Sequence, residues 1–161
     1  MLGLWNNVLD TSNLSRDLAL LSSPEMERAV LALLLVKPEL LIDIEADVQE
    51  EDFTITHHKI LYQALKKILY VSVKTKASLV FDTVIIMDYV KLMNVENEYL
   101  SSSRGMEYIE SIRQSASLSD ENNFSFYVSV IRSCTTKRLM YVETIKIQRE
   151  LIGVPQKDVE E

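Results

Sequence analysis

Apolar residues recur at helical spacing along most of this 161-residue chain, and one stretch is denser than the others. Over Pro24–Val36 they cover most of the surface, a pattern typical of a helix at the centre of a core. Ser23 precedes this run and can cap its free N–H groups, while proline suits a first helical turn. The pattern therefore predicts a central helix there, followed by a short helix from Pro38 to about Ile44.

The middle of the chain predicts three further segments. Residues Thr56–Leu69 have one apolar face and predict an amphipathic helix, whereas the β-branched residues of 70–77 favour an extended segment or a frayed loop. Asp82 is placed to cap a helix that continues to about Met93. A shorter helix is predicted over Gly105–Ser115.

The longest helical pattern runs from about Asn122 to Ile152 and ends at Gly153, a residue type common after helix C-termini. A helix of that length would span roughly 46 Å, more than the ~30 Å diameter of a domain this size. One end is therefore expected to project from the body. Apolar side chains on a projecting helix usually need a partner.

Composition favours an all-α fold. The chain has three glycines and three prolines, too few for the many tight turns of a β-rich fold. Its apolar fraction of 47% is typical of a globular protein, and its length fits one domain. We therefore expect a compact all-α helical bundle with a long C-terminal helix.

Charge and hydropathy limit the partners. The net charge is −7, so direct, extensive DNA contact is not expected, although Lys66-Lys67 and Lys137-Arg138 form short basic stretches. The longest apolar run, Ala29–Val36, is far shorter than the ~20 residues that span a bilayer. No secretory signal precedes it. These features predict a cytoplasmic protein without a membrane segment.

Signals for chemistry are missing. A phosphate-binding loop cannot be built from Gly3, Gly105 and Gly153, the chain's glycines. Adjacent histidines such as His57 and His58 point about 100° apart on a helix, so they do not form a two-ligand face. The acidic cluster at 50–52 is expected to be a solvated turn. We therefore expect no catalysis, no cofactor and no metal site in this chain.

A series of short motifs nevertheless has a recognisable order. A helix with Glu-x-Glu-x-x-Val-Leu precedes Asp-Phe and then His-Lys-x-Leu-Tyr, and later come Gly-x-x-Tyr-Ile and Tyr-x-x-x-Ile-Arg. The residues concerned are Glu25, Glu27, Val30, Leu31, Asp52, Phe53, His58, Lys59, Leu61, Tyr62, Asp82, Gly105, Tyr108, Ile109, Tyr127, Ile131, Arg132 and Arg138. In this order they resemble the N-terminal domain of DnaB-type replicative DNA helicases. Ala32 and Leu33 stand where that family often has two glycines, which suggests a divergent, phage- or plasmid-like member.

The resemblance implies a bundle with a projecting helical hairpin. In such helicases the hairpins pair the domains, three pairs form a collar on the hexamer, and the collar contacts primase or a helicase loader. Residues 22–152 would form the domain, 1–21 an N-terminal extension with a possible short helix, and 153–161 a linker or the start of the second hairpin arm. Scaffold roles are expected for Glu27, Asp52, Phe53, His58, Tyr62 and Tyr108. Contacts within an oligomer or with a partner are expected for Tyr127, Ile131, Arg138, Leu139, Val142 and Ile145, although packing inside the bundle explains their periodicity equally well.

Three hypotheses follow from the resemblance. The leading one is a non-catalytic collar domain that mediates self-association and contact with primase or loader, in a parent protein with ATP-dependent helicase activity. The second is a standalone loader or inhibitor that mimics this domain on a replicative helicase. The third is the helicase-binding C-terminal domain of a primase, against which a start at Met1 argues. The length of the gene beyond Glu161 separates the first two.

Overall fold

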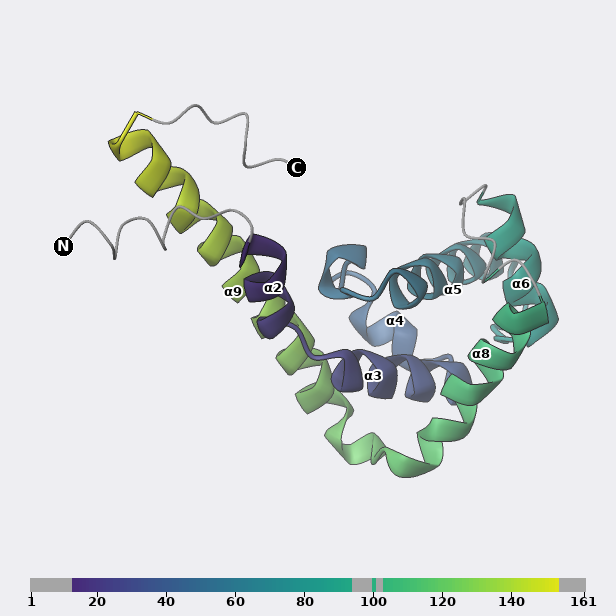
Figure 1. Cartoon of the computed structure of the whole chain (residues 1–161). Helices are drawn as coiled ribbons and strands as arrows, with labels where there is room; N and C mark the ends of the chain where they lie inside the picture. Colours follow the sequence, from purple (N-terminus) through teal and green to yellow (C-terminus); the bar gives the residue numbers. More distant parts are fainter. Residues whose placement is uncertain (1–12, 94–99, 101–102, 154–161) are drawn as a thin grey trace. The chain divides into compact units, whose positions relative to one another are not determined.

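The computed structural model describes residues 13–93, 100 and 103–153, and all regular structure within them is helical (Figure 1). This confirms the predicted all-α class with a long C-terminal helix. The chain divides into two compact units, a larger one of Ser23–Arg132 and a smaller one formed by the stretches up to Ser22 and from Ser133. The predicted single domain over 22–152 is a different division and stays a prediction.

The larger unit is a bundle built around two helix pairs. Helix α3 packs against α8, and α5 packs against α6 (Figure 1). The elements of this unit are α3 (Pro24–Val36), α4 (Leu40–Ile44), η2 (Glu50–Asp52), α5 (Thr56–Thr75), α6 (Thr83–Leu92), α8 (Ser103–Gln114), η3 (Ser115–Leu118), η4 (Glu121–Asn123) and the first part of α9 (Phe124–Leu151).

Helix α3 is the centre of the core, as its apolar surface predicts. Every residue from Val30 to Leu35 is buried, and four of them are fully inaccessible to solvent, as are Leu61 of α5 and Ile109 of α8. A helix buried on most sides cannot be amphipathic, which explains why its sequence lacks a polar face.

Two local expectations are wrong. Ser23 is the residue before α3, but its side chain makes no capping hydrogen bond; its carbonyl instead accepts from the Glu27 N–H at 3.0 Å. Helix α5 does not end at 69 but continues to Thr75, where Lys76 adopts a left-handed conformation with φ of 54°. The buried Ser72 hydroxyl donates to the Ala77 carbonyl at 2.7 Å and closes this end. The strand preference of the β-branched residues is too weak to end the helix earlier, even though Val71 and Val73 are exposed.

The next two helices lie where the sequence predicts them, although α8 begins at Ser103, two residues before the predicted start. One carboxylate oxygen of Asp82 accepts from the N–H groups of Val84 at 2.8 Å and Ile85 at 3.3 Å, so the predicted cap of α6 is confirmed. Near the start of α8, a Cβ on Gly105 would lie 2.0 Å from the Leu100 carbonyl oxygen. The absence of a side chain at Gly105 therefore permits this close approach of the backbone.

The smaller unit contains α2 (Leu14–Leu20) and the rest of α9. The Arg138 guanidinium donates to the Leu21 carbonyl at 2.9 Å, and the Tyr141 hydroxyl donates to Asp17 at 2.5 Å. That bond raises the pKa of the Tyr141 phenol. The short helix predicted in the N-terminal extension is thus confirmed and is bonded to α9. The predicted second hairpin arm near 158 lies outside the described residues.

Candidate interaction surfaces

A buried carboxylate joins α3 to the start of α5. The Glu27 side chain is 1% exposed, and one of its oxygens accepts from the Thr54 N–H at 2.8 Å and from the Thr54 hydroxyl. Its other oxygen accepts from the Ile55 N–H at 3.3 Å and lies 2.8 Å from the His58 Nδ1. Both oxygens are therefore satisfied, as a buried charge requires.

The electrostatics of this network follow from its hydrogen bonds. Burial alone would raise the pKa of Glu27, but the bonds from His58, Thr54 and Ile55 outweigh it and hold that pKa below its ordinary value. His58 is itself buried and stacks on Tyr108, with 6.3 Å between ring centroids. The network fixes the turn between two core helices and leaves no carboxylate oxygen free for a substrate.

The neighbouring aromatic pair closes the other side of that turn. The Phe53 and Tyr62 rings lie 4.7 Å apart, and the Tyr62 hydroxyl donates to the Val48 carbonyl at 2.9 Å. Burial, followed by the charge of Asp52, raises the pKa of the Tyr62 phenol. Asp52 accepts from the Gln49 N–H at 2.8 Å. Five of the expected scaffold residues thus lie around one turn, and the sixth, Tyr108, stacks on it from α8.

Sequence reasoning missed Arg113, which bridges three elements. Its guanidinium donates to the carbonyls of Leu35 and Phe81, both at 2.7 Å, and to the Thr83 hydroxyl at 3.2 Å. The carbonyls in the last turn of a helix lack intrahelical donors, so Arg113 supplies one to α3. A single arginine in a polar helix carries no sequence pattern that would have revealed this role.

The expected interface residues of α9 fall into two groups. In the larger unit, Ile131 is buried in the core and Tyr127 is packed against it. In the smaller unit, Ile145 is buried, Val142 and Arg138 are half-buried, and Leu139 is 66% exposed. Their part in an interface stays a prediction, and Leu139 is the large apolar side chain among them that is accessible to a partner.

Three exposed apolar residues that the sequence analysis did not single out follow one side of α9. Met140, Ile147 and Leu151 are 65%, 50% and 81% exposed. Their spacing of seven and eleven residues places them on one helix face, because a helix turns about 100° per residue. Arg138 and Ile145 lie on the opposite side. We call Leu139, Met140, Ile147 and Leu151 the α9 surface.

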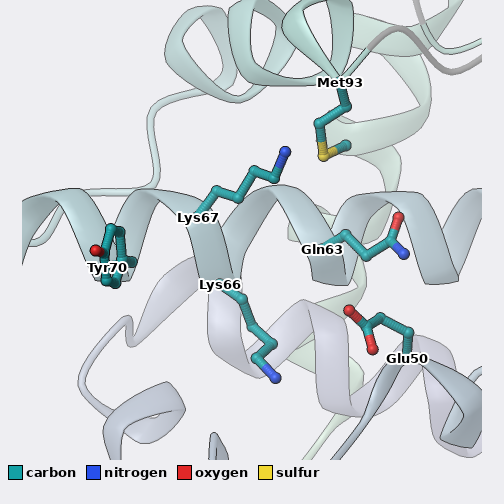
Figure 2. A pocket seen from close by; sticks show the side chains of 6 residues that line it. All are labelled: Glu50, Gln63, Lys66, Lys67, Tyr70 and Met93. Atoms are coloured by element: carbon teal, nitrogen blue, oxygen red, sulfur yellow. The ribbon is translucent and has the colours of Figure 1, made fainter.

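A second surface lies on α5 (Figure 2). A cavity of about 340 Å³ is lined by Glu50, Gln63, Lys66, Lys67, Tyr70 and Met93. The lysine side chains leave α5 in different directions, with Lys67 directed toward Met93 and Lys66 toward the side of Glu50 (Figure 2). This site is open and basic on the α5 side and acidic at Glu50.

Among the described residues, no group of three or more His, Cys, Asp and Glu side chains is placed to hold a metal ion. His57 instead makes an edge contact with the Tyr108 ring at 5.4 Å. No helix in the described ranges is long and apolar enough to cross a membrane.

Comparison with known protein families identifies the family of this chain. The chain matches no curated protein sequence. The family model described as the DnaB-like helicase N-terminal domain matches residues 19–133, well over half of the chain. The match ends beside Arg132, the last residue of the larger unit, and covers the scaffold residues around the Glu27 turn. The chain belongs to the family of DnaB-like helicase N-terminal domains.

Proposed function

We propose that this chain is a non-catalytic interaction domain of a DnaB-type replicative helicase. It associates with itself through the α9 surface, as pairs within a hexameric collar, and contacts primase or a helicase loader during DNA replication. ATP hydrolysis and unwinding belong to the parent helicase, and the domain acts in the cytoplasm without a cofactor or extensive DNA contact. The family match supports the helicase association.

The exposure of the α9 surface is the observation that carries the proposal. Met140, Ile147 and Leu151 share one exposed face of α9, and Leu139 lies exposed about 100° beside it. The side opposite Met140 is occupied within the chain, where Arg138 bonds the Leu21 carbonyl. Large apolar side chains grouped on one exposed helix face are typical of protein–protein contacts. A symmetric dimer would bury the same face of two copies against each other.

Sedimentation equilibrium tests the self-association. We expect the wild-type chain to dimerise reversibly, and the variant Met140→Glu/Ile147→Glu to sediment as a monomer, because it places charges in the apolar contact. Val84→Glu/Leu118→Glu is the matched control, since both of its sites are exposed apolar residues of the larger unit. A wild-type chain that remains monomeric at all concentrations, or a control that dissociates equally, contradicts the proposal.

A further inference from the structure

Helix α5 carries an unusual share of the chain's positive charge. Thr56–Thr75 contains Lys59, Lys66, Lys67 and Lys74 and no aspartate or glutamate. Since these lysines contribute +4 to a net charge of −7, the rest of the chain carries −11. A cationic helix on an anionic domain produces a local field that attracts acidic partners.

The charge is arranged along one face of the helix. Gln63, Lys66, Lys67, Tyr70 and Lys74 follow one another at helical spacing and form what we call the α5 stripe. Four of them line the 340 Å³ cavity that Glu50 and Met93 complete (Figure 2). The stripe covers the twelve residues from Gln63 to Lys74, roughly 16 Å of helix or three turns.

The ammonium groups of the stripe have weak partners. The Lys66 Nζ lies 3.5 Å from the Gln49 side-chain oxygen and 5.8 Å from the Tyr62 ring centre. The Lys74 Nζ lies 5.1 Å from the Tyr70 ring centre. In the part of the chain that the structure describes, Lys66, Lys67 and Lys74 form no ion pair within 4.0 Å. Their charges are available to carboxylates of another molecule.

An apolar anchor accompanies these charges. Tyr70 is 62% exposed and Val73, on the next turn, is 69% exposed. Tyrosine is enriched among residues that dominate binding energy at protein interfaces, whereas solvated lysines alone give little affinity. The combination of a lysine row, an exposed tyrosine and an open cavity matches an amphipathic helix as occupant.

We propose that the α5 stripe docks an acidic helix of a partner protein, with carboxylates on Lys66, Lys67 and Lys74 and one apolar side chain in the cavity between Tyr70 and Met93. The inference deepens the proposed function, because it gives the partner contact a place and a chemistry apart from the α9 surface. Separate carboxylates can avoid Glu50, whereas a continuous phosphate backbone would meet its negative charge at the rim of the cavity.

A selection experiment tests the chemistry without a known partner. A library of helical peptides, randomised on one face, is selected on the full chain and counter-selected on Lys66→Glu/Lys67→Glu. We expect enriched peptides with Asp or Glu at i and i+3 or i+4 beside a leucine or aromatic residue. In fluorescence polarisation, the double variant should weaken their binding at least a hundredfold, and Tyr70→Ala should weaken it about tenfold.

The controls separate this inference from the self-association. Arg16→Glu/Lys137→Glu makes the same charge change at exposed sites outside the stripe and should retain binding within about threefold. The inference is overturned if basic or uncharged peptides are enriched, or if the same peptides are enriched equally on the double variant. It is also overturned if oligo-dT binds more tightly than the selected peptides and its binding depends on the same lysines. If Met140→Glu/Ile147→Glu loses dimerisation but still binds the peptides, the α5 docking site is unaffected. The self-association and the peptide binding can therefore be disproved independently.

Discussion

The two units of this chain use their apolar residues in different ways. In Ser23–Arg132, large side chains such as Leu31 and Leu34 are fully enclosed by neighbouring helices, and the buried carboxylate of Glu27 has every oxygen bonded. In the smaller unit, Leu139 and Met140 of α9 are exposed, and the bonds to α2 come from polar groups at its surface. The family match covers the whole of the larger unit and only residues 19–22 and 133 of the smaller one.

The residues that identify the family therefore differ from the residues that are available to a partner. Residues that hold a core have fixed neighbours, so their types and spacing carry a family signature that sequence reasoning can find. Residues that meet a partner need exposure and a face, and neither depends on a local motif. A substitution in the larger unit should therefore cost more stability than the same substitution in the smaller unit.

Two glycines provide the strongest contrast. Gly105→Ala should destabilise the chain by about 3 kcal/mol, because the new Cβ would lie 2.0 Å from the Leu100 carbonyl oxygen and the backbone must move. Gly153→Ala should cost about 1 kcal/mol or less, because its φ of +73° is strained but nothing lies within 4 Å. Urea unfolding followed by circular dichroism measures the loss of stability in both variants. Equal losses would contradict the expected difference between the two units.

Sequence predicted most of the helices because burial imposes a period that the core residues must follow. It placed α3 correctly from Pro24 to Val36, and the cap of α6 at Asp82. It missed the last turns of α5, whose end is marked by the left-handed Lys76 and not by the β-branched residues before it. It also missed the bridge made by Arg113, which joins segments far apart in the chain. Such contacts depend on tertiary placement rather than on local pattern.

The candidate surfaces were predicted less completely than the fold. The sequence analysis singled out Leu139 on α9 and the basic pair Lys66-Lys67, but not Met140 or Tyr70. Both missed residues lie outside the buried stripe of their helix, and both are more than 60% exposed. Only the position of the neighbouring helices decides which side of a long helix is exposed.

The contribution of the buried Glu27 carboxylate to the stability of the larger unit should depend on pH. Glu27→Gln should cost about 2 kcal/mol near neutral pH, because its amide nitrogen would face the N–H donor of either Thr54 or Ile55. The folded-state pKa of Glu27 lies below the unfolded value of 4.5, so the ionised group stabilises the fold above that pH. This contribution is lost as the pH falls through the folded-state pKa.

Unfolding curves of wild type and Glu27→Gln, measured from neutral to acidic pH, check this sign. The difference in unfolding free energy between them should shrink on acidification. Glu25→Gln is the matched control, an exposed glutamate two residues away, and should cost less than about 0.5 kcal/mol at every pH. A difference that grows toward acidic pH would show that the charged carboxylate does not stabilise the fold.

The smallest expected effect belongs to Arg149, and the half-buried Arg113 of the larger unit serves as its comparison. Arg149 of the smaller unit is 4% exposed, yet its Nε and Nη1 have no hydrogen-bond partner within the described part of the chain. Arg149→Met should therefore leave the unfolding free energy within about 0.5 kcal/mol of wild type or raise it, since it removes an uncompensated charge and keeps the apolar stem. Arg113→Met should cost about 3 kcal/mol, because it leaves the carbonyls of Leu35 and Phe81 without their donor. If Arg149→Met lowers the unfolding free energy more than Arg113→Met does, the charge of Arg149 is compensated in the folded chain. The smaller unit would then be as closely packed as the larger one.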